Sequence, residues 1–450
     1  MIDFSRPLWQ RFLTFLMPLM LSNILQSLSG TVNSVYIGQM IGTHALAAIS
    51  TFFPIMFLLI SFVIGLASGA AILIGQAWGA KNIKKIKEVT GTTLTVGFLL
   101  GCVVAVFGAF YARDLMSLLG VPPEVLDLSA GYGRIVLIGM PGFFIFLLIT
   151  SMLRGVGDTI TPLFSLTLSI IVGLFVTPAL IQGWFGLPQL GVDAAAVAFI
   201  AGFLVVLVFL YFWLLRKQSP MAPDADLIRS LKVDFKLLGV ILKLGIPAGV
   251  AMIVASISGL VIVGIVNRFG VDATASFGAV NQVLSYIQFP AMSISIAASI
   301  FAAQAIGARR LDEVERVTKT ALLMNLIITG GLVVLAYIGS EYLIRAFITD
   351  DGVVEVAERL LHIVLWSCVV SGWGTVFSSV MRASGDVWIP MVLSLAAIIC
   401  VEIPAALILS NIYGLDGVWI GYCLSFSALL LFQATYYLGF WRKKEIKALV

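Results

Sequence analysis

A short loop motif of arginine, glycine, aspartate and proline occurs twice in this sequence at a fixed spacing. The matched residues, each pair 228 positions apart, are Arg154 and Arg382, Gly157 and Gly385, Asp158 and Asp386, and Pro162 and Pro390. The same spacing relates a second motif, in which Gln76 and Gly79 correspond to Gln304 and Gly307. A fixed period over most of the chain indicates one ancestral unit used twice. The sequence therefore predicts two similar halves.

The composition predicts that both halves lie in a membrane. Hydrophobic residues make up 60% of the 450 residues and charged residues 11%, against about 25% charged residues in a soluble domain. A helix needs about 20 apolar residues to cross the hydrocarbon layer, and this criterion predicts twelve spans. They are Leu13–Ile37, Ala45–Ile74, Thr92–Tyr111, Tyr132–Met152, Pro162–Ile181, Val192–Leu215, Leu244–Val266, Thr274–Ala302, Ala321–Tyr342, Leu361–Met381, Ile389–Leu409 and Gly417–Phe440.

The predicted fold is an all-α membrane protein with twelve transmembrane helices in two pseudo-symmetric six-helix bundles. Residues 1–215 form the N-terminal bundle, residues 216–243 a polar cytoplasmic linker, and residues 244–450 the C-terminal bundle. Six crossings return the chain to its starting side, so the repeats are parallel. The loops of one face hold 22 of the 27 lysines and arginines. By the positive-inside rule, both termini are cytoplasmic.

The cytoplasmic loop motifs are predicted to be structural. Asp158 and Asp386, together with Arg154 and Arg382, are expected to fix tight turns, and a glycine beside each aspartate permits the bend. We expect the paired glutamine and glycine loops, at Gln76 and Gln304, to serve the framework in the same way.

Motifs of covalent catalysis are missing from the sequence. It has no GxxxxGK[ST] phosphate loop, no HExxH and no GxSxG, and it has two histidines far apart. The four cysteines stand singly in apolar runs, so the sequence predicts no metal and no cofactor. The net charge of +4 does not imply a nucleic acid partner. We expect instead a protein that moves a compound across the membrane and is not an enzyme.

Glu402 is the clearest candidate for coupling this movement to a cation. It lies inside the eleventh predicted span, two residues before Pro404, where inserting a carboxylate costs about 2.5–3.5 kcal/mol. Proline frees a helical carbonyl, so a broken helix beside the acid could bind a cation or hold a proton. The repeat offers Val176 at the corresponding position. The alternative is a carboxylate near the outer rim that pairs with an arginine or reaches water.

Several amides are candidates for lining a cavity and contacting substrate. They are Gln26 and Asn33 in the first predicted span, and Asn281, Gln282 and Gln288 in the eighth. Such residues also bond to neighbouring membrane helices, and both interpretations stay open for them.

Taken together, these motifs resemble the multidrug and toxic compound extrusion (MATE) family. Supporting the resemblance are Leu16-Met17-Pro18, residues 32–38 (Val-Asn-Ser-Val-Tyr-Ile-Gly) and Ala45-Leu46-Ala47-Ala48. The resemblance implies a two-bundle exporter with a central cavity, open to each side in turn. It also implies acids that this chain lacks. Family members commonly carry an aspartate where this sequence has Asn33, some carry a glutamate in place of Ala255, and one branch carries an aspartate in place of Thr177.

The predicted function is secondary active multidrug export, in which an organic, often cationic, compound is antiported against protons or sodium ions by alternating access. A lipid-linked oligosaccharide flippase of the same superfamily is the alternative, disfavoured because no basic residue sits deep in a span. A gradient-free channel or a regulatory membrane protein is a third possibility. The expected partners are a small-molecule substrate, H⁺ or Na⁺ and the lipid bilayer, for a monomer that spans the plasma (inner) membrane several times.

Overall fold

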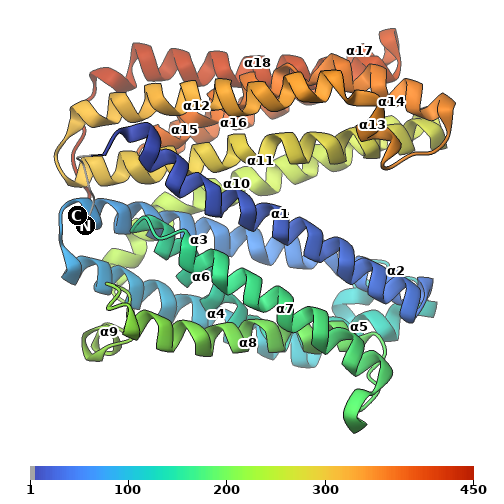
Figure 1. The fold of residues 1–450 in the computed structure, drawn as a ribbon, viewed down its shortest axis with the longest axis horizontal. Coiled ribbons are helices and arrows are strands. Elements are labelled where there is room, and N and C mark those ends of the chain that lie inside the picture. Colours follow the sequence, from blue (N-terminus) through green and yellow to red (C-terminus); the bar gives the residue numbers. More distant parts are fainter. Residues whose placement is uncertain (1–5) are drawn as a thin grey trace. The chain divides into compact units, whose positions relative to one another are not determined.

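The computed structural model describes residues 6–450, which form helices and no strand (Figure 1). The chain builds two compact units. Unit 1 contains residues 6–20, 75–81 and 247–450, and unit 2 contains residues 21–74 and 82–246. Three helices contribute to both units, namely α1 (Leu8–Met40), α3 (Phe53–Gly79) and α10 (Phe235–Val266).

Unit 2 contains the remaining helices of the first half. These are α2 (Thr43–Ser50), α4 (Ile83–Leu118), α5 (Pro123–Ile138), α6 (Met140–Gly155), α7 (Ile160–Gln182), η1 (Trp184–Gly186), α8 (Asp193–Arg216) and α9 (Ala225–Arg229). Helices α7 and α8 run side by side (Figure 1). Helix α10 approaches α3 closely, because a Cβ on Gly69 would overlap the carbonyl oxygen of Ile241. Small residues at such crossings let membrane helices pack backbone to backbone.

Unit 1 contains the remaining helices of the second half. These are η2 (Asn267–Phe269), α11 (Val271–Gly307), α12 (Leu311–Ile338), α13 (Ser340–Arg345), α14 (Asp351–Val364), α15 (Ser367–Ala383), α16 (Trp388–Ala396), η3 (Ala397–Glu402), α17 (Ile403–Tyr413), α18 (Leu415–Gly439) and η4 (Trp441–Lys443). Helix α11 contributes to both apolar cores of this unit. One core includes Phe12, Phe301 and Val380, and the other includes Phe277 and Trp419.

The membrane-spanning prediction is confirmed, with two bends that the sequence analysis did not anticipate. Ten helices of the described chain are long and apolar enough to cross a membrane, and two bent helix pairs bring the number to twelve. The pair α5 and α6 bends by 55°, and the pair α14 and α15 by 42°. The pairs begin at Pro123 and Asp351, 228 residues apart. The repeat therefore extends to the shape of the helices.

The predicted linker packs within unit 2 and is partly ordered by α4. Lys87 of α4 forms an ion pair with Asp224, whose carboxylate also caps α9 by accepting from the amide of Leu227 at 2.9 Å. Thr92 donates to the carbonyl of Lys232 at 3.2 Å. The units therefore place residues 6–20 and 75–81 with the second half and the whole linker with the first. The functional division at 1–215, 216–243 and 244–450 stays a prediction.

Candidate functional site

The candidate site in unit 1 is formed around Glu402, at an irregular turn of a membrane-spanning helix. Helix α16 continues into a π-helical turn, Ala397–Glu402, and then into α17. Pro404 follows at the second position of α17, where it cannot donate a hydrogen bond to the carbonyl of residue 400. Single π turns inside α-helices occur frequently at functional sites. The break beside the acid, predicted from Pro404, is present as this turn.

Two serines from neighbouring helices bind the carboxylate. Ser258 of α10 donates its hydroxyl to Oε1 of Glu402 at 2.6 Å, and Ser425 of α18 donates to Oε2 at 3.1 Å. The exposed fraction is 7% for Glu402, 1% for Ser258 and 2% for Ser425. Among the residues that the structure describes, no ion pair includes Glu402. Hydroxyl groups of two helices, and not an arginine, therefore satisfy the acid.

Aromatic side chains of α18 lie one and two turns before Ser425. The rings of Tyr422 and Trp419 are 5.3 Å apart, and Phe277 of α11 lies 5.0 Å from Trp419. The indole Nε1 of Trp419 is buried and has no hydrogen-bond partner in the described part of the chain. The helix that carries Ser425 is therefore anchored in a tightly packed apolar core.

This oxygen-rich, enclosed arrangement can hold either a proton or a single small cation. The carboxylate and the two hydroxyls supply oxygen ligands of the kind that hard cations prefer. Groups of three or more histidines, cysteines or acids that could hold a metal ion do not occur among the described residues. One carboxylate suits exchange of a monovalent ion better than permanent binding of a metal.

The amide candidates are divided between the two units. Gln26 and Asn33 lie on the part of α1 that belongs to unit 2, and both side chains are exposed. Asn281, Gln282 and Gln288 lie on α11 in unit 1, where Gln282 is exposed and the other two are half-buried. In the described chain none of these three bonds to Glu402. Their contact with a substrate stays a prediction.

The glutamine and glycine motifs, expected in loops, form the last turns of α3 and α11, and these two helix ends pack directly on each other inside unit 1. A Cβ on Gly79 would overlap the carbonyl oxygen of Gln304, and a Cβ on Gly307 would overlap that of Gln76. The buried Gln76 amide donates to the carbonyl of Ala383 at 2.8 Å, and its oxygen accepts from the amide of Leu449 at 2.7 Å. Gln76 therefore joins the end of α3 to the end of α15 and to the C-terminal tail.

The aspartate loops use lysines as partners. Asp158 accepts from the amide of Thr161 at 3.0 Å and pairs with Lys217 at 2.7 Å. Asp386 pairs with Lys444 at 2.8 Å. In both loops the glycine has a left-handed φ, +90° at Gly157 and +92° at Gly385, which explains why glycine occurs there.

Arg154 and Arg382 form no ion pair with these aspartates among the residues that the structure describes, and their role in fixing the turns stays a prediction. The Nε of each arginine is buried without a hydrogen-bond partner in the described chain, and Arg382 instead donates to Ser379 at 3.1 Å. Sequence analysis missed Lys217 and Lys444, although they lie 227 residues apart and each follows the last membrane-spanning helix of its half. It also missed Ser258 and Ser425, because serines are common in membrane helices and no sequence signal marks the helices that meet at Glu402.

Comparison with known proteins identifies relatives over the whole chain. The family model described as MatE matches twice, at residues 18–179 and 247–408. The chain is 43% identical over 449 residues to the probable multidrug resistance protein YoeA of Bacillus subtilis, covering 99% of this chain and 97% of YoeA. It is 22% identical to the multidrug export protein MepA of Staphylococcus aureus, covering 92% of this chain and 89% of MepA.

The fold matches a solved transporter structure closely. The crystal structure of a point mutant of the Vibrio cholerae MATE transporter VcmN superimposes with a TM-score of 0.89 at 19% identity, over 97% of this chain and 98% of that one. The two-bundle architecture with repeated halves is thereby confirmed. The double match of the family model also confirms that the chain is a tandem repeat.

Proposed function

Because the chain belongs to the MatE family, we propose that it exports organic, often cationic, compounds in exchange for protons or sodium ions. The relatives named as multidrug resistance and multidrug export proteins support the substrate class. The single observation that carries the coupling proposal is Glu402, a buried acid held by Ser258 and Ser425 on two other helices. The repeat has Val176 in its place, so the acid is not needed to build the fold.

Binding of a proton at Glu402 changes the contacts between three helices. The ionised carboxylate accepts hydrogen bonds from α10 and α18 at once, and hydrogen bonds to a charged group are worth about 1.5–3 kcal/mol, against about 1 kcal/mol for neutral ones. Protonation turns one oxygen into a donor and weakens both bonds. A sodium ion bound to the same oxygens displaces the serine protons from the carboxylate. Either ion therefore favours a different packing of α10, α17 and α18, which is what alternating access requires.

The driving force is large enough for drug export. One charge that moves through 100 mV supplies about 2.3 kcal/mol, and each 1.4 kcal/mol is about a factor of ten. For an uncharged substrate, one coupling ion can therefore sustain a gradient of roughly fiftyfold. One-for-one exchange with a cationic substrate moves no net charge, so it draws on the concentration gradient of the ion.

The test is efflux of a fluorescent organic cation from proteoliposomes with proton and sodium gradients imposed separately. Glu402→Gln keeps the shape of the side chain and removes its charge, and it should abolish gradient-driven efflux. Glu355→Gln, at an exposed site on α14, is the matched control and should transport like the wild type. Coupled efflux that survives in Glu402→Gln would exclude this acid.

The same vesicles separate the export proposal from the flippase alternative. A flippase would move a phosphate-linked lipid between leaflets and leave the dye inside. Dye efflux without lipid movement supports the exporter, and the reverse result would replace it.

A further inference from the structure

A basic pocket lies at the end of unit 1 where α1 and α12 begin, on the face that the charge distribution assigns to the cytoplasm. Its volume is about 480 Å³. The lining residues are Arg6, Pro7, Leu8, Arg11, Glu313, Arg316, Lys319 and Thr320. The lining has four basic residues and one acidic residue; without Lys319, whose ammonium group pairs with Glu315 outside the pocket, its net charge is +2. Neither Glu402 nor any other candidate site residue contributes to it.

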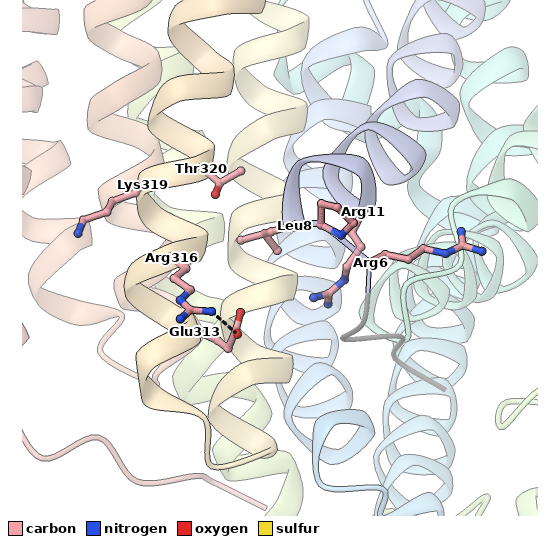
Figure 2. Close-up of a pocket in the computed structure, with 8 residues that line it drawn as sticks. Arg6, Leu8, Arg11, Glu313, Arg316, Lys319 and Thr320 are labelled. Atoms are coloured by element: carbon pink, nitrogen blue, oxygen red, sulfur yellow. Dashed lines mark hydrogen bonds and ion pairs between the residues drawn. The ribbon is translucent and has the colours of Figure 1, made fainter.

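Arginines approach the pocket from both walls. Arg6 and Arg11 lie at the start of α1, one of them with its guanidinium turned away from α12 in the view of Figure 2, and Arg316 lies on α12, where it bonds to Glu313 at 3.3 Å. Arg11 is held in position by the ring of Phe301, which lies 5.2 Å from its guanidinium carbon. Lys319 turns toward the other side of α12 and pairs with Glu315 at 2.9 Å (Figure 2). Planar guanidinium groups are well suited to bind phosphate oxygens.

The repeat supplies an internal comparison for this charge cluster. Counterparts at the 228- and 229-residue spacings exist for each basic residue of the lining. They are Phe235 for Arg6, Val240 for Arg11, Glu88 for Arg316 and Gly91 for Lys319. None is basic, and Gly91 packs against Ser230 of the linker. The basic residues at the start of the corresponding helix α4 are Lys84, Lys85 and Lys87, at other positions, so the arginine positions of the cluster in unit 1 are not repeated in the first half.

The pocket opens beside an exposed apolar surface of a membrane-spanning helix. Thr320 lines the pocket, and the exposed side chains of Leu323, Ile327 and Val334 continue along the same face of α12. Exposed Trp9, on α1 next to the pocket residue Leu8, is of the residue type enriched at the membrane–water interface. A molecule with an anionic head and apolar chains fits both the charge of the pocket and the apolar stripe below it.

We propose that this pocket binds the headgroup of an anionic phospholipid of the cytoplasmic leaflet, with its acyl chains along α12. A phosphate diester would bind between Arg6, Arg11 and Arg316. Basic pockets between transmembrane helices on the cytoplasmic side are known to bind acidic headgroups. The headgroup would tie the start of α1 to α12, because the lining residues come from both helices.

Native mass spectrometry of the full-length protein in detergent, titrated with phosphatidylglycerol or with phosphatidylcholine of the same chains, tests this proposal. We expect phosphatidylglycerol to bind more tightly. The Arg6→Gln/Arg316→Gln double variant removes one guanidinium from each wall. Each basic side chain near an acidic lipid contributes about fivefold, and Glu313 offsets part of this, so the apparent Kd should rise about tenfold.

Two further variants make the test specific to the pocket. Lys84→Gln/Lys236→Gln removes two exposed charges outside it and should leave the Kd unchanged. Glu313→Gln removes the pocket's own acid and should tighten binding several-fold. Equal loss in both double variants would reduce the effect to overall charge and overturn the proposal. Displacement of the lipid by millimolar inorganic phosphate would assign the pocket to a soluble anion and overturn the lipid assignment.

Discussion

Replacing Gly307 by alanine tests the packing of the two glutamine motifs. The added Cβ would overlap the backbone carbonyl oxygen of Gln76, an atom that cannot move without displacing its helix. Overpacking of this kind costs about 1–3 kcal/mol, whereas alanine gains up to about 1 kcal/mol over glycine in a helix. The net expectation is a destabilisation of about 1–2 kcal/mol.

The same helix provides the matched control. Gly278 of α11 is exposed, and a Cβ placed there meets nothing within 4 Å. Gly278→Ala should therefore show only the stability gained from the higher helix propensity of alanine, and it should raise the apparent melting temperature in detergent. Gly307→Ala should lower the melting temperature. Gly79→Ala should resemble Gly307→Ala, because its Cβ would meet the carbonyl oxygen of Gln304.

The double variant tests whether the two glycines share one contact. Residues in contact couple energetically, so Gly79→Ala/Gly307→Ala should destabilise by less than the sum of the single changes, since one separation of the helices relieves both overlaps. A Gly307→Ala protein as stable as the Gly278→Ala protein would show that the helix ends are not packed in this way.

Two other contacts give predictions of stability. Gln76→Leu leaves the buried carbonyl of Ala383 without its donor and should cost about 1–3 kcal/mol, measured as a lower melting temperature, whereas Leu at exposed Gln10 should change little. The hydrogen bond from Lys87 lowers the pKa of Asp224 below its ordinary value of 3.8. This pair therefore stabilises the fold above that pH, and the contribution is lost as the pH falls through the folded-state pKa. Asp224→Asn should lower the melting temperature at pH 7, and the difference from the wild type should shrink as the pH falls below 3.8; a difference that stays constant on acidification would contradict the assignment.

Repetition and hydrophobicity predicted the architecture because both are properties of long stretches of sequence. The 228-residue spacing required two like halves, and the apolar runs gave the crossings. The bends between α5 and α6 and between α14 and α15 were not predicted, since a bent pair and a single span have the same apolar content. Glycines in the loops were predicted correctly because a left-handed φ at Gly157 and Gly385 leaves few other choices.

Side-chain partners were much harder to predict than elements. Lys217 and Lys444, which pair with Asp158 and Asp386 from the ends of other helices, were not predicted because they lie far from these aspartates in sequence. Glu402 was singled out because its charge is rare in an apolar span. Ser258 and Ser425 could not be singled out in this way. Only the packing of α10 and α18 around the turn that carries Glu402 distinguishes these two serines from the others.

Differences between the halves are the best guide to what this chain does beyond folding. A contact that the fold needs should occur in both repeats, as it does for the glycines at 79 and 307 and for the aspartate and lysine pairs. Glu402 and the arginines at the start of α1 and in α12 lack counterparts, and both cost free energy, through burial of a carboxylate in one case and crowding of like charges in the other. Groups that are costly and unnecessary for the architecture are retained for what they bind. On this argument, exchanging Glu402 for the valine of the other half should abolish coupled dye efflux, while the fold loses no more than about 1–3 kcal/mol, the cost expected when the buried Ser258 hydroxyl loses its acceptor; coupled efflux that persists in a folded Glu402→Val protein would contradict it.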